Sequence, residues 1–182
     1  MIPVHKLCGR LGNQMFQYAY LHAQVREGKI PDIYVQSEEY FKKYAHEVKA
    51  IFGANINIIN MVAIHVRRGD YVNNLFYVDL MQTDYYQKAM DMFLDAQFLV
   101  FSDDIEWCKK QPMFENCEFS EGNDEVTDMN LMAGCTGHII ANSSYSWWSA
   151  YIAPFTKKVV APKAWYSDGI QRTTCPTKWI RL

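Results

Sequence analysis

The sequence lacks several features that would place it in a specialised class of protein. No apolar run approaches the roughly 18 residues that a membrane-spanning helix needs. The opening residues, MIPVHKLCGR, lack the long apolar segment of a secretory signal peptide. The formal charge at pH 7 is only −2, so we expect no broad basic surface for nucleic acid or anionic lipid. Any basic site must therefore be local.

Disulfide and zinc frameworks are also missing. The 182 residues include five cysteines, an odd number, and no C-x-x-C pair or His/Cys spacing typical of zinc sites. We therefore expect a reducing compartment, the cytoplasm of a bacterial cell. Peripheral association with the inner face of the membrane stays open, and the sequence does not reveal the oligomeric state.

Two common nucleotide-binding motifs, G-x-x-x-x-G-K-[ST] and G-x-G-x-x-G, are absent, which argues against the common ATPase and NAD-binding classes. What the chain does have is a high aromatic content of 15%. Aromatic-rich clefts suit sugars and bases, although core packing explains the same composition equally well. Trp147 and Trp148 are adjacent, so they cannot face the same way, and at least one is predicted to lie in the core. For Trp165 and Trp179 we also expect packing.

Strand-like and helix-like segments alternate along most of the chain. The chain begins with a predicted strand at 2–8, a glycine-bounded turn at 9–14 and a helix at 14–26. Ser37 is placed to cap a further helix at 37–52. Further strands are predicted at 61–66, 97–104, 137–144 and 157–162, the last of the chain, with helices at 83–95, from 104, at 124–135 and at 144–153. This alternation predicts an α/β fold with a parallel sheet covered by helices on both faces.

The predicted strands end in polar residues that suit an anionic ligand. In such a sheet, ligands bind outside the carboxyl ends of the strands. AIHVRRGDYV (63–72) places Arg67 and Arg68 there, and adjacent arginines bind anions through charge-assisted hydrogen bonds. ANSSYS (141–146) and GRLGNQ (9–14) both open helices, whose N-termini favour phosphate. The sequence therefore predicts a site for a diphosphate-bearing ligand, with a surface salt bridge as the alternative explanation of the arginines.

Other polar residues near these strand ends allow two interpretations each. Asp103 and Asp104 look like a metal-binding pair, but helix capping accounts for them as well, with Asp103 as N-cap and Glu106 closing a capping box. His65 is either a core histidine or a ligand contact. Asp128 lies at the start of an apolar helix and could simply cap it.

At this point several segments resemble a known family. In chain order they are GRLGNQMFQYA, VAIHVRRGDYV, FLVFSDDIEWC, DMNLMAGCTGHIIANSSYSWWSAY and VVAPKAWY. They resemble the blocks of the bacterial α-1,2-fucosyltransferases, the family that also includes the blood-group H enzymes of animals. The match covers both ends of the chain and most of residues 61–166, and the H-x-R-R-x-D and NSS[FY]SWW blocks are its most specific parts.

The resemblance implies a GT-B-like fold of two Rossmann-type lobes with the active site in the cleft between them. It implies transfer of L-fucose from GDP-β-L-fucose to the 2-hydroxyl of a terminal β-galactoside, with inversion and without a metal or cofactor. Residues 1–60 would form a shortened or incomplete acceptor-side lobe and residues 61–182 the GDP-fucose-binding lobe. Family members are longer, so we expect internal segments to be missing, with breaks in the backbone near 28–32 or 56–62.

Individual roles follow from the same resemblance. Arg67 would bind the diphosphate and stabilise its departing charge, His65 and Asp128 would hold the guanosine, and Asp70 would be either the catalytic base or a salt-bridge partner of the arginines. The other predicted donor-binding residues are Arg68, Arg10, Gly12, Asn13, Asn142, Ser143 and Ser144. The acceptor candidates are Tyr71, Asn73, Asn74 and Tyr77. Two alternatives stay open, a transferase of another nucleotide sugar and a non-catalytic nucleotide- or glycan-binding protein.

Overall fold

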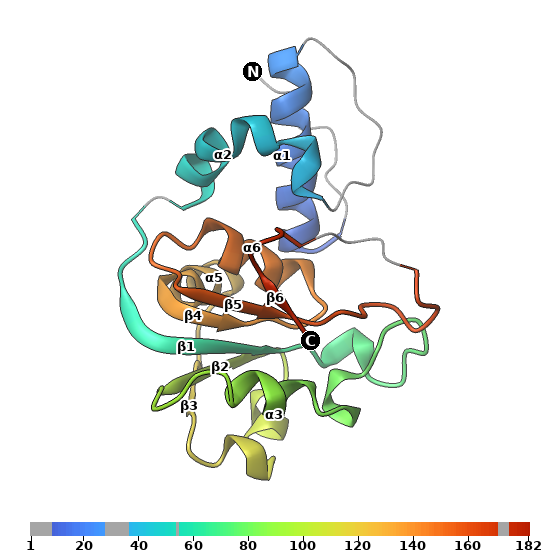
Figure 1. Cartoon of the computed structure of the whole chain (residues 1–182), viewed down its shortest axis with the longest axis vertical. Coiled ribbons are helices and arrows are strands. Elements are labelled where there is room, and N and C mark those ends of the chain that lie inside the picture. The colour runs from blue at the N-terminus through green and yellow to red at the C-terminus, as the bar shows by residue number, and fades with distance from the viewer. Residues whose placement is uncertain (1–8, 28–36, 54, 171–174) are drawn as a thin grey trace.

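A six-stranded, all-parallel sheet lies at the centre of the molecule. The computed structural model describes residues 9–27, 37–53, 55–170 and 175–182. The strands are β1 (Ile59–Val66), β2 (Phe98–Ser102), β3 (Glu118–Phe119), β4 (Cys135–Ile139), β5 (Lys158–Ala161) and β6 (Ile180–Arg181). Their order in the sheet is β3-β2-β1-β4-β5-β6 (Figure 1). This strand order is that of a Rossmann-type sheet. From β1, successive strands are added first on one side of the sheet and then, beginning with β4, on the other, so the strand order reverses between β1 and β4.

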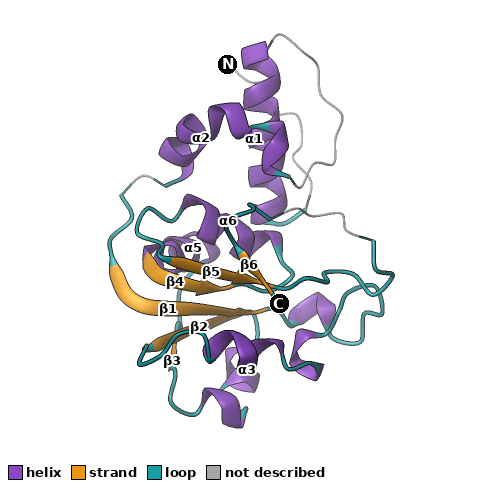
Figure 2. Cartoon of the chain, in the orientation of Figure 1, coloured by secondary structure: helices purple, strands orange, loops and turns teal. Residues whose placement is uncertain are grey.

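Helices cover both faces of the sheet, as Figure 2 shows. They are α1 (Leu11–Glu27), α2 (Ala45–Phe52), α3 (Tyr85–Met90), α4 (Ile105–Cys108), α5 (Glu125–Gly134) and α6 (Ser144–Ile152). Single turns of 3-10 helix lie at Glu38–Tyr40, Lys42–Tyr44, Gly69–Tyr71, Leu80–Gln82 and Pro112–Phe114. Along β5, Val159 packs with the α6 cluster and Val160 with the α3 cluster, because successive strand residues point to opposite faces. The predicted α/β class and parallel sheet are therefore confirmed.

Helix α6 is covered on two sides, by the sheet and by the N-terminal helices. Trp147 stacks on Tyr151 at 4.7 Å between ring centroids, whereas Trp148 stacks on Phe41 at 5.5 Å. Both tryptophans are fully buried, so the expectation that at least one lies in the core is confirmed. Trp165 and Trp179 are buried in the same cluster, as predicted, although both lie outside the candidate site described below.

Several predicted element boundaries are wrong. The helix predicted at 37–52 is two 3-10 turns followed by α2, although Ser37 does cap the first turn by accepting the backbone N–H of Glu39. The helix predicted at 83–95 ends at Met90, and the strand predicted at 137–144 ends at Ile139. The strand at 157–162 is not the last, because β6 adds to β5 at the edge of the sheet.

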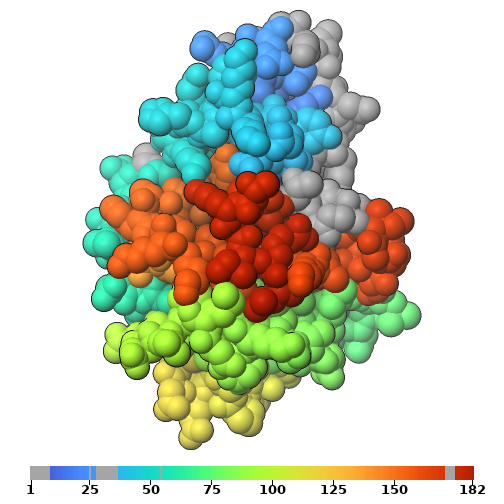
Figure 3. Space-filling model, viewed as in Figure 1, coloured from blue at the N-terminus to red at the C-terminus, as the bar shows by residue number. Residues whose placement is uncertain are grey.

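The N-terminal part of the chain shares its core with the sheet domain. The ring centroids of Phe16 in α1 and Trp147 in α6 are 4.5 Å apart, and Val48 of α2 belongs to the same buried cluster. In the space-filling view these helices form a continuous surface with the rest of the chain (Figure 3). Within residues 9–27, 37–53 and 55–58 the structure contains helices and turns but no strand, so a second Rossmann-type lobe is not shown.

Other predictions about this region stay untested. The strand predicted at 2–8 and the break predicted near 28–32 lie outside the described residues. The domain boundary at residue 60 and the missing internal segments stay predictions. None of the helices in the described ranges combines the length and apolar character needed to cross a membrane.

Candidate active site

A cavity of about 430 Å³ opens at the carboxyl ends of β1 and β4, where the strand order reverses. This is the position at which Rossmann-type sheets bind ligands, because the connections from the two strands leave in opposite directions and open a crevice. The cavity is lined by nine of the predicted site residues: Arg10, Gly12, Asn13, His65, Arg67, Asp70, Asp128, Ser143 and Ser144. Segments separated by more than a hundred residues in the sequence therefore meet in one site.

The N-termini of α1 and α6 meet at this cavity. A Cβ added to Gly12 would lie 2.5 Å from the carbonyl carbon of Ser144, so only glycine permits this contact. Ser144 Oγ donates to Asn13 Oδ1 at 2.9 Å, and Ser143 caps α6 by accepting the backbone N–H of Tyr145 at 3.3 Å. Two helix N-termini, each carrying a partial positive charge, thus favour an anion in the cavity.

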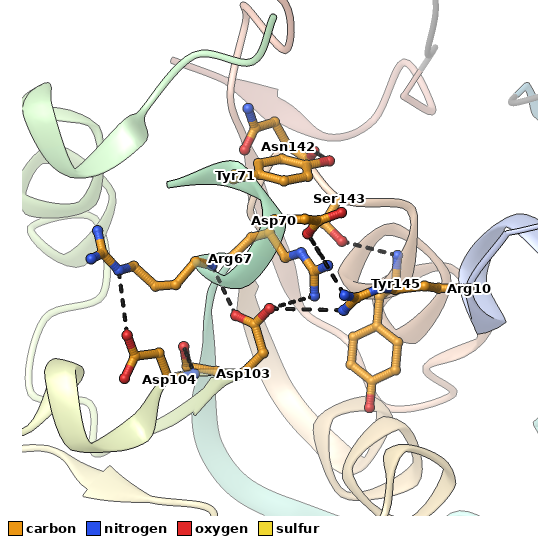
Figure 4. A network of polar contacts seen from close by, with 11 residues as sticks. Arg10, Arg67, Asp70, Tyr71, Asp103, Asp104, Asn142, Ser143 and Tyr145 are labelled. Carbon is orange, nitrogen blue, oxygen red and sulfur yellow. Dashed lines mark hydrogen bonds and ion pairs between the residues drawn. The ribbon is translucent and has the colours of Figure 1, made fainter. Parts of the chain in front are cut away.

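Arg67 is held at the cavity wall by two carboxylates (Figure 4). Its Nη1 lies 2.7 Å from Asp103 Oδ2, its Nη2 donates to Asp70 Oδ1, and its guanidinium lies 5.4 Å from the ring centre of Tyr71. Arg10 approaches from the α1 side and lies 3.9 Å from both Asp70 and Asp103. The Arg67 side chain is 10% exposed, so these contacts fix a largely buried cation beside the two helix N-termini.

Asp103 is not the helix cap that the sequence predicts. Asp104 caps α4 by accepting the backbone N–H of Trp107, and Glu106 pairs with Lys109 instead of closing a capping box. Asp103 accepts the backbone N–H of Arg68 at 2.8 Å while its other oxygen binds Arg67. The prediction of Asp103 as N-cap with Glu106 closing a capping box is therefore wrong, and the neighbouring Asp104 is the cap.

Gly69 makes the approach of Asp103 possible. A Cβ added at Gly69 would lie 2.3 Å from Asp103 Oδ2, which any larger residue would displace from Arg67. The sequence contained one signal for this role, because Asp103 directly follows β2 at the same carboxyl edge of the sheet as Arg67.

Arg68 and Asn142 do not line this cavity, although both are predicted to bind the donor. The Arg68 guanidinium lies 3.6 Å from the ring centre of Trp107, and its Nε is 3.9 Å from Asp104. Asn142 uses its side-chain amide to donate to the carbonyls of Val78 and Trp165 at 2.9 and 3.0 Å. These contacts give both side chains structural roles, and their predicted donor contacts have no support from the geometry.

His65 fits both of its proposed interpretations, because it is buried in the core and lines the cavity. It is 4% exposed, and its ring lies 5.5 Å from that of Tyr145. Burial, with a smaller contribution from Arg67, lowers its pKa to about 3, so the imidazole is neutral at pH 7. Its Nδ1 has no hydrogen-bond partner within the described part of the chain. An orphaned buried nitrogen at a cavity wall is suited to a bound ligand.

Asp128 is also not a simple cap. Asp124 caps α5 by accepting the backbone N–H of Thr127 at 2.7 Å. Asp128 lies one turn later and accepts hydrogen bonds from Ser120 Oγ at 2.7 Å and Asn123 Nδ2 at 3.2 Å. These two hydrogen bonds orient its carboxylate, which lines the cavity.

The metal interpretation of Asp103 and Asp104 is not supported by their geometry, since each carboxylate is committed to different partners. Throughout the ranges that the structure describes, no group of three or more His, Cys, Asp or Glu side chains is arranged to hold a metal ion. Cys108, Cys117, Cys135 and Cys175 are free thiols.

Fold and site together define a Rossmann-type protein with a pocket suited to an anion where the strand order reverses. Comparison with known proteins identifies the group more closely. The sequence model of glycosyl transferase family 11 matches residues 38–182, and the chain belongs to that family. The prediction of fucosyltransferase-family membership is therefore confirmed.

Named relatives agree with this assignment. An alpha-1,2-colitosyltransferase of Escherichia coli is 36% identical over 179 residues, covering 81% of this chain and 60% of the relative. The O-antigen biosynthesis glycosyltransferase WbnK of Escherichia coli is 36% identical over 135 residues, which cover 68% of this chain and 45% of the relative. Human galactoside alpha-(1,2)-fucosyltransferase 1 is 31% identical over 109 residues, which cover 50% of this chain and 28% of the relative. The chain thus spans less than two thirds of the length of these relatives.

Proposed function

We propose that this protein transfers L-fucose from GDP-β-L-fucose to the 2-hydroxyl of a terminal β-galactoside, with inversion. One observation carries the proposal, namely that two helix N-termini and the guanidinium of Arg67 converge on one cavity at the reversal of the sheet. A diphosphate is the part of a nucleotide sugar that such a cluster of donors recognises. Family membership and the names of the relatives support a sugar as the group transferred.

In this proposal the donor lies along the cavity from α5 to α1. Asp128 accepts hydrogen bonds from the guanine, and the neutral His65 faces the nucleoside. The diphosphate lies against the N-termini of α1 and α6, where Ser143 Oγ can donate while its lone pair accepts from Tyr145. Arg67 stands beside it as a fixed positive charge.

The chemistry follows from where charge develops. As the bond between fucose C1 and the β-phosphate oxygen breaks, the sugar becomes oxocarbenium-like and the diphosphate gains negative charge, which Arg67 and the helix N-termini stabilise. The acceptor 2-hydroxyl oxygen attacks C1 from the opposite face, and its proton passes to a carboxylate. Asp70 suits this role because its side chain is 56% exposed and lines the cavity beside Arg67. Its pairing with Arg67 also makes it a positioning residue.

Thermal stabilisation by nucleotides provides the first test. GDP and GDP-fucose should raise the melting temperature, whereas UDP and ADP should not, since a ligand that binds only the folded state stabilises it by mass action. The Arg67→Ala variant should lose this effect. Transfer of fucose to lactose in the presence of EDTA should continue, because the proposed reaction requires no divalent metal. A folded wild-type protein that GDP fails to stabilise would overturn the proposal.

Transfer of colitose is a second candidate, because the relative with 81% coverage of this chain is named for that sugar. The guanosine and diphosphate contacts would be the same in both cases, so GDP binding does not separate the two. Parallel assays with the GDP-linked forms of fucose and colitose do, since the ratio of their kcat/KM values measures the preference. We propose the cytoplasm as the place of the reaction.

A further inference from the structure

One wall of the active-site cavity differs from the rest in its chemistry. Residues 71–78, YVNNLFYV, contain no charged side chain and directly follow Asp70. Tyr71 and Tyr77 of this stretch line the same cavity as Arg10, Arg67 and Asp128. The charged part of the cavity suits a nucleotide diphosphate, whereas this uncharged part suits a neutral ligand with apolar surface.

The aromatic rings of this wall form a layered cluster. Tyr71 and Tyr77 stack with ring centroids 3.8 Å apart and an interplanar angle of 5°, and Tyr71 Oη donates to the carbonyl of Asn142 at 3.0 Å. Phe76 packs against Tyr77 at 5.1 Å and against Tyr166 at 5.2 Å. Phe76 nevertheless keeps 45% of its surface exposed. An exposed aromatic side chain, which does not itself line the cavity, thus adjoins the cavity-lining ring of Tyr77.

The backbone of this loop is fixed in place. Val78 N–H donates to the carbonyl of Trp165 at 3.2 Å, and the carbonyl of Phe76 accepts from Ser167 N–H at 3.0 Å. Asn74 donates to the carbonyl of Asp70 and accepts from the N–H of Phe76 through the same side chain. A wall held in this way needs little ordering when a ligand binds.

These contacts separate the predicted acceptor residues into two groups. Asn74 is committed to hydrogen bonds within the loop, and Asn73 occupies the left-handed region at φ 62°, which is typical of a turn. Tyr77 remains as a cavity-lining ring stacked on Tyr71, and Phe76, which the sequence did not single out, packs against Tyr77 as an exposed neighbouring ring.

We infer that Phe76 and Tyr77 form the acceptor subsite and bind a β-galactopyranoside through the apolar face of its ring. This inference rests on the proposed function. A β-galactopyranose presents C–H groups of positions 3, 4 and 5 on one face, and such C–H groups pack on aromatic rings. Its equatorial hydroxyls lie at the ring edge, and its axial 4-hydroxyl projects from the opposite face. A sugar stacked here has its 2-hydroxyl edge free to approach Asp70, the carboxylate next to the aromatic wall in the chain.

Steady-state kinetics of matched variants test the inference. Phe76→Ala should raise the acceptor KM for lactose about five- to tenfold, the range expected for loss of one aromatic contact, and leave the donor KM unchanged. Phe155→Ala is the control, because Phe155 is similarly exposed at 39% but precedes β5, at the edge of the sheet opposite the carboxyl ends that form the site. Tyr77→Leu, which removes the ring but keeps an apolar side chain, should also raise the acceptor KM. An unchanged acceptor KM in folded Phe76→Ala, or an equal rise in both KM values, would refute the subsite.

A binding measurement separates this inference from the proposed function. Saturation-transfer NMR with methyl β-D-galactopyranoside should show the strongest transfer to H3, H4 and H5 in the wild type and a marked loss in Phe76→Ala. If GDP stabilises the protein but the sugar protons show no such pattern, the subsite is wrong while the proposed function stands. If GDP fails to bind, the proposed function fails independently of the sugar measurement.

Discussion

Replacing Asp103 by asparagine tests how the active-site cation is held. Asp103→Asn keeps the size of the side chain and an oxygen that can accept the backbone N–H of Arg68. It removes the negative charge opposite Arg67 and places either a neutral oxygen or an amide group against the guanidinium. The change therefore isolates the charge of this carboxylate from its shape.

The magnitude follows from the geometry and the burial of the pair. The two charged groups are 2.7 Å apart, with side-chain exposures of 10% for Arg67 and 24% for Asp103. Breaking a fully buried pair costs about 3–5 kcal/mol, and a hydrogen bond to a charged group contributes about 1.5–3 kcal/mol. Because Asp70 still pairs with Arg67, we expect a loss of about 2 kcal/mol of unfolding free energy. For a chain of this size that lowers the melting temperature by roughly 4–8 °C.

The assay combines unfolding with kinetics. Denaturant unfolding measures the stability change, and fucosyl transfer measures the positioning of Arg67, where we expect kcat to fall about tenfold or more. Asp104→Asn is the matched control, because asparagine caps a helix as well as aspartate does. It should leave both quantities nearly unchanged.

Equal effects of the two neighbouring substitutions would refute the reasoning, since only Asp103 contacts Arg67. A variant with wild-type stability and kcat would refute it as well. In that case the pairing of Arg67 with Asp70 would be sufficient to hold the guanidinium.

Three further predictions concern packing and pH. Gly12→Ala should lower both the melting temperature and the affinity for GDP, because its Cβ would meet the backbone of Ser144; unchanged GDP binding by calorimetry would contradict this. Asn142→Asp should destabilise by about 3 kcal/mol in denaturant unfolding, since a buried carboxylate replaces an amide that donates two hydrogen bonds. Burial lowers the pKa of His65 to about 3, with a contribution from Arg67, and that of His138 to about 4. Below about pH 6.5 the unfolded chain therefore binds protons at these histidines that the native state does not bind. The free energy of unfolding is thus highest above about pH 6.5. It falls by about 1.4 kcal/mol per pH unit for each histidine as the pH drops toward these pKa values. His138→Gln should flatten this slope, and an unfolding free energy independent of pH between 7 and 5 would exclude the effect.

Local sequence patterns were sufficient to predict much of the fold. The strands at 61–66 and 157–162 and the helices at 14–26 and 144–153 lie close to β1, β5, α1 and α6, because hydrophobic periodicity and capping residues act over short distances. The two-residue strands β3 and β6 were missed, since each owes its strand geometry to pairing with a neighbour. Helix lengths around residues 37–52 and 83–95 were wrong for the same reason, as tertiary packing decides where a marginal helix ends.

The candidate site likewise has features that the sequence predicts and features that only the tertiary structure shows. The sequence alone determined the parallel α/β class, the delivery of Arg67, Asp70, Ser143 and Asn13 to strand and helix ends, and the resemblance to a family of sugar transferases. Only the tertiary structure decided which side chains face one another. It paired Arg67 with Asp103 across 36 residues, turned Arg68 toward Trp107, and stacked Tyr71 on Tyr77. The reason is physical, because a strand end fixes where a residue lies, whereas the partner of its side chain depends on a neighbouring strand that the local sequence does not specify.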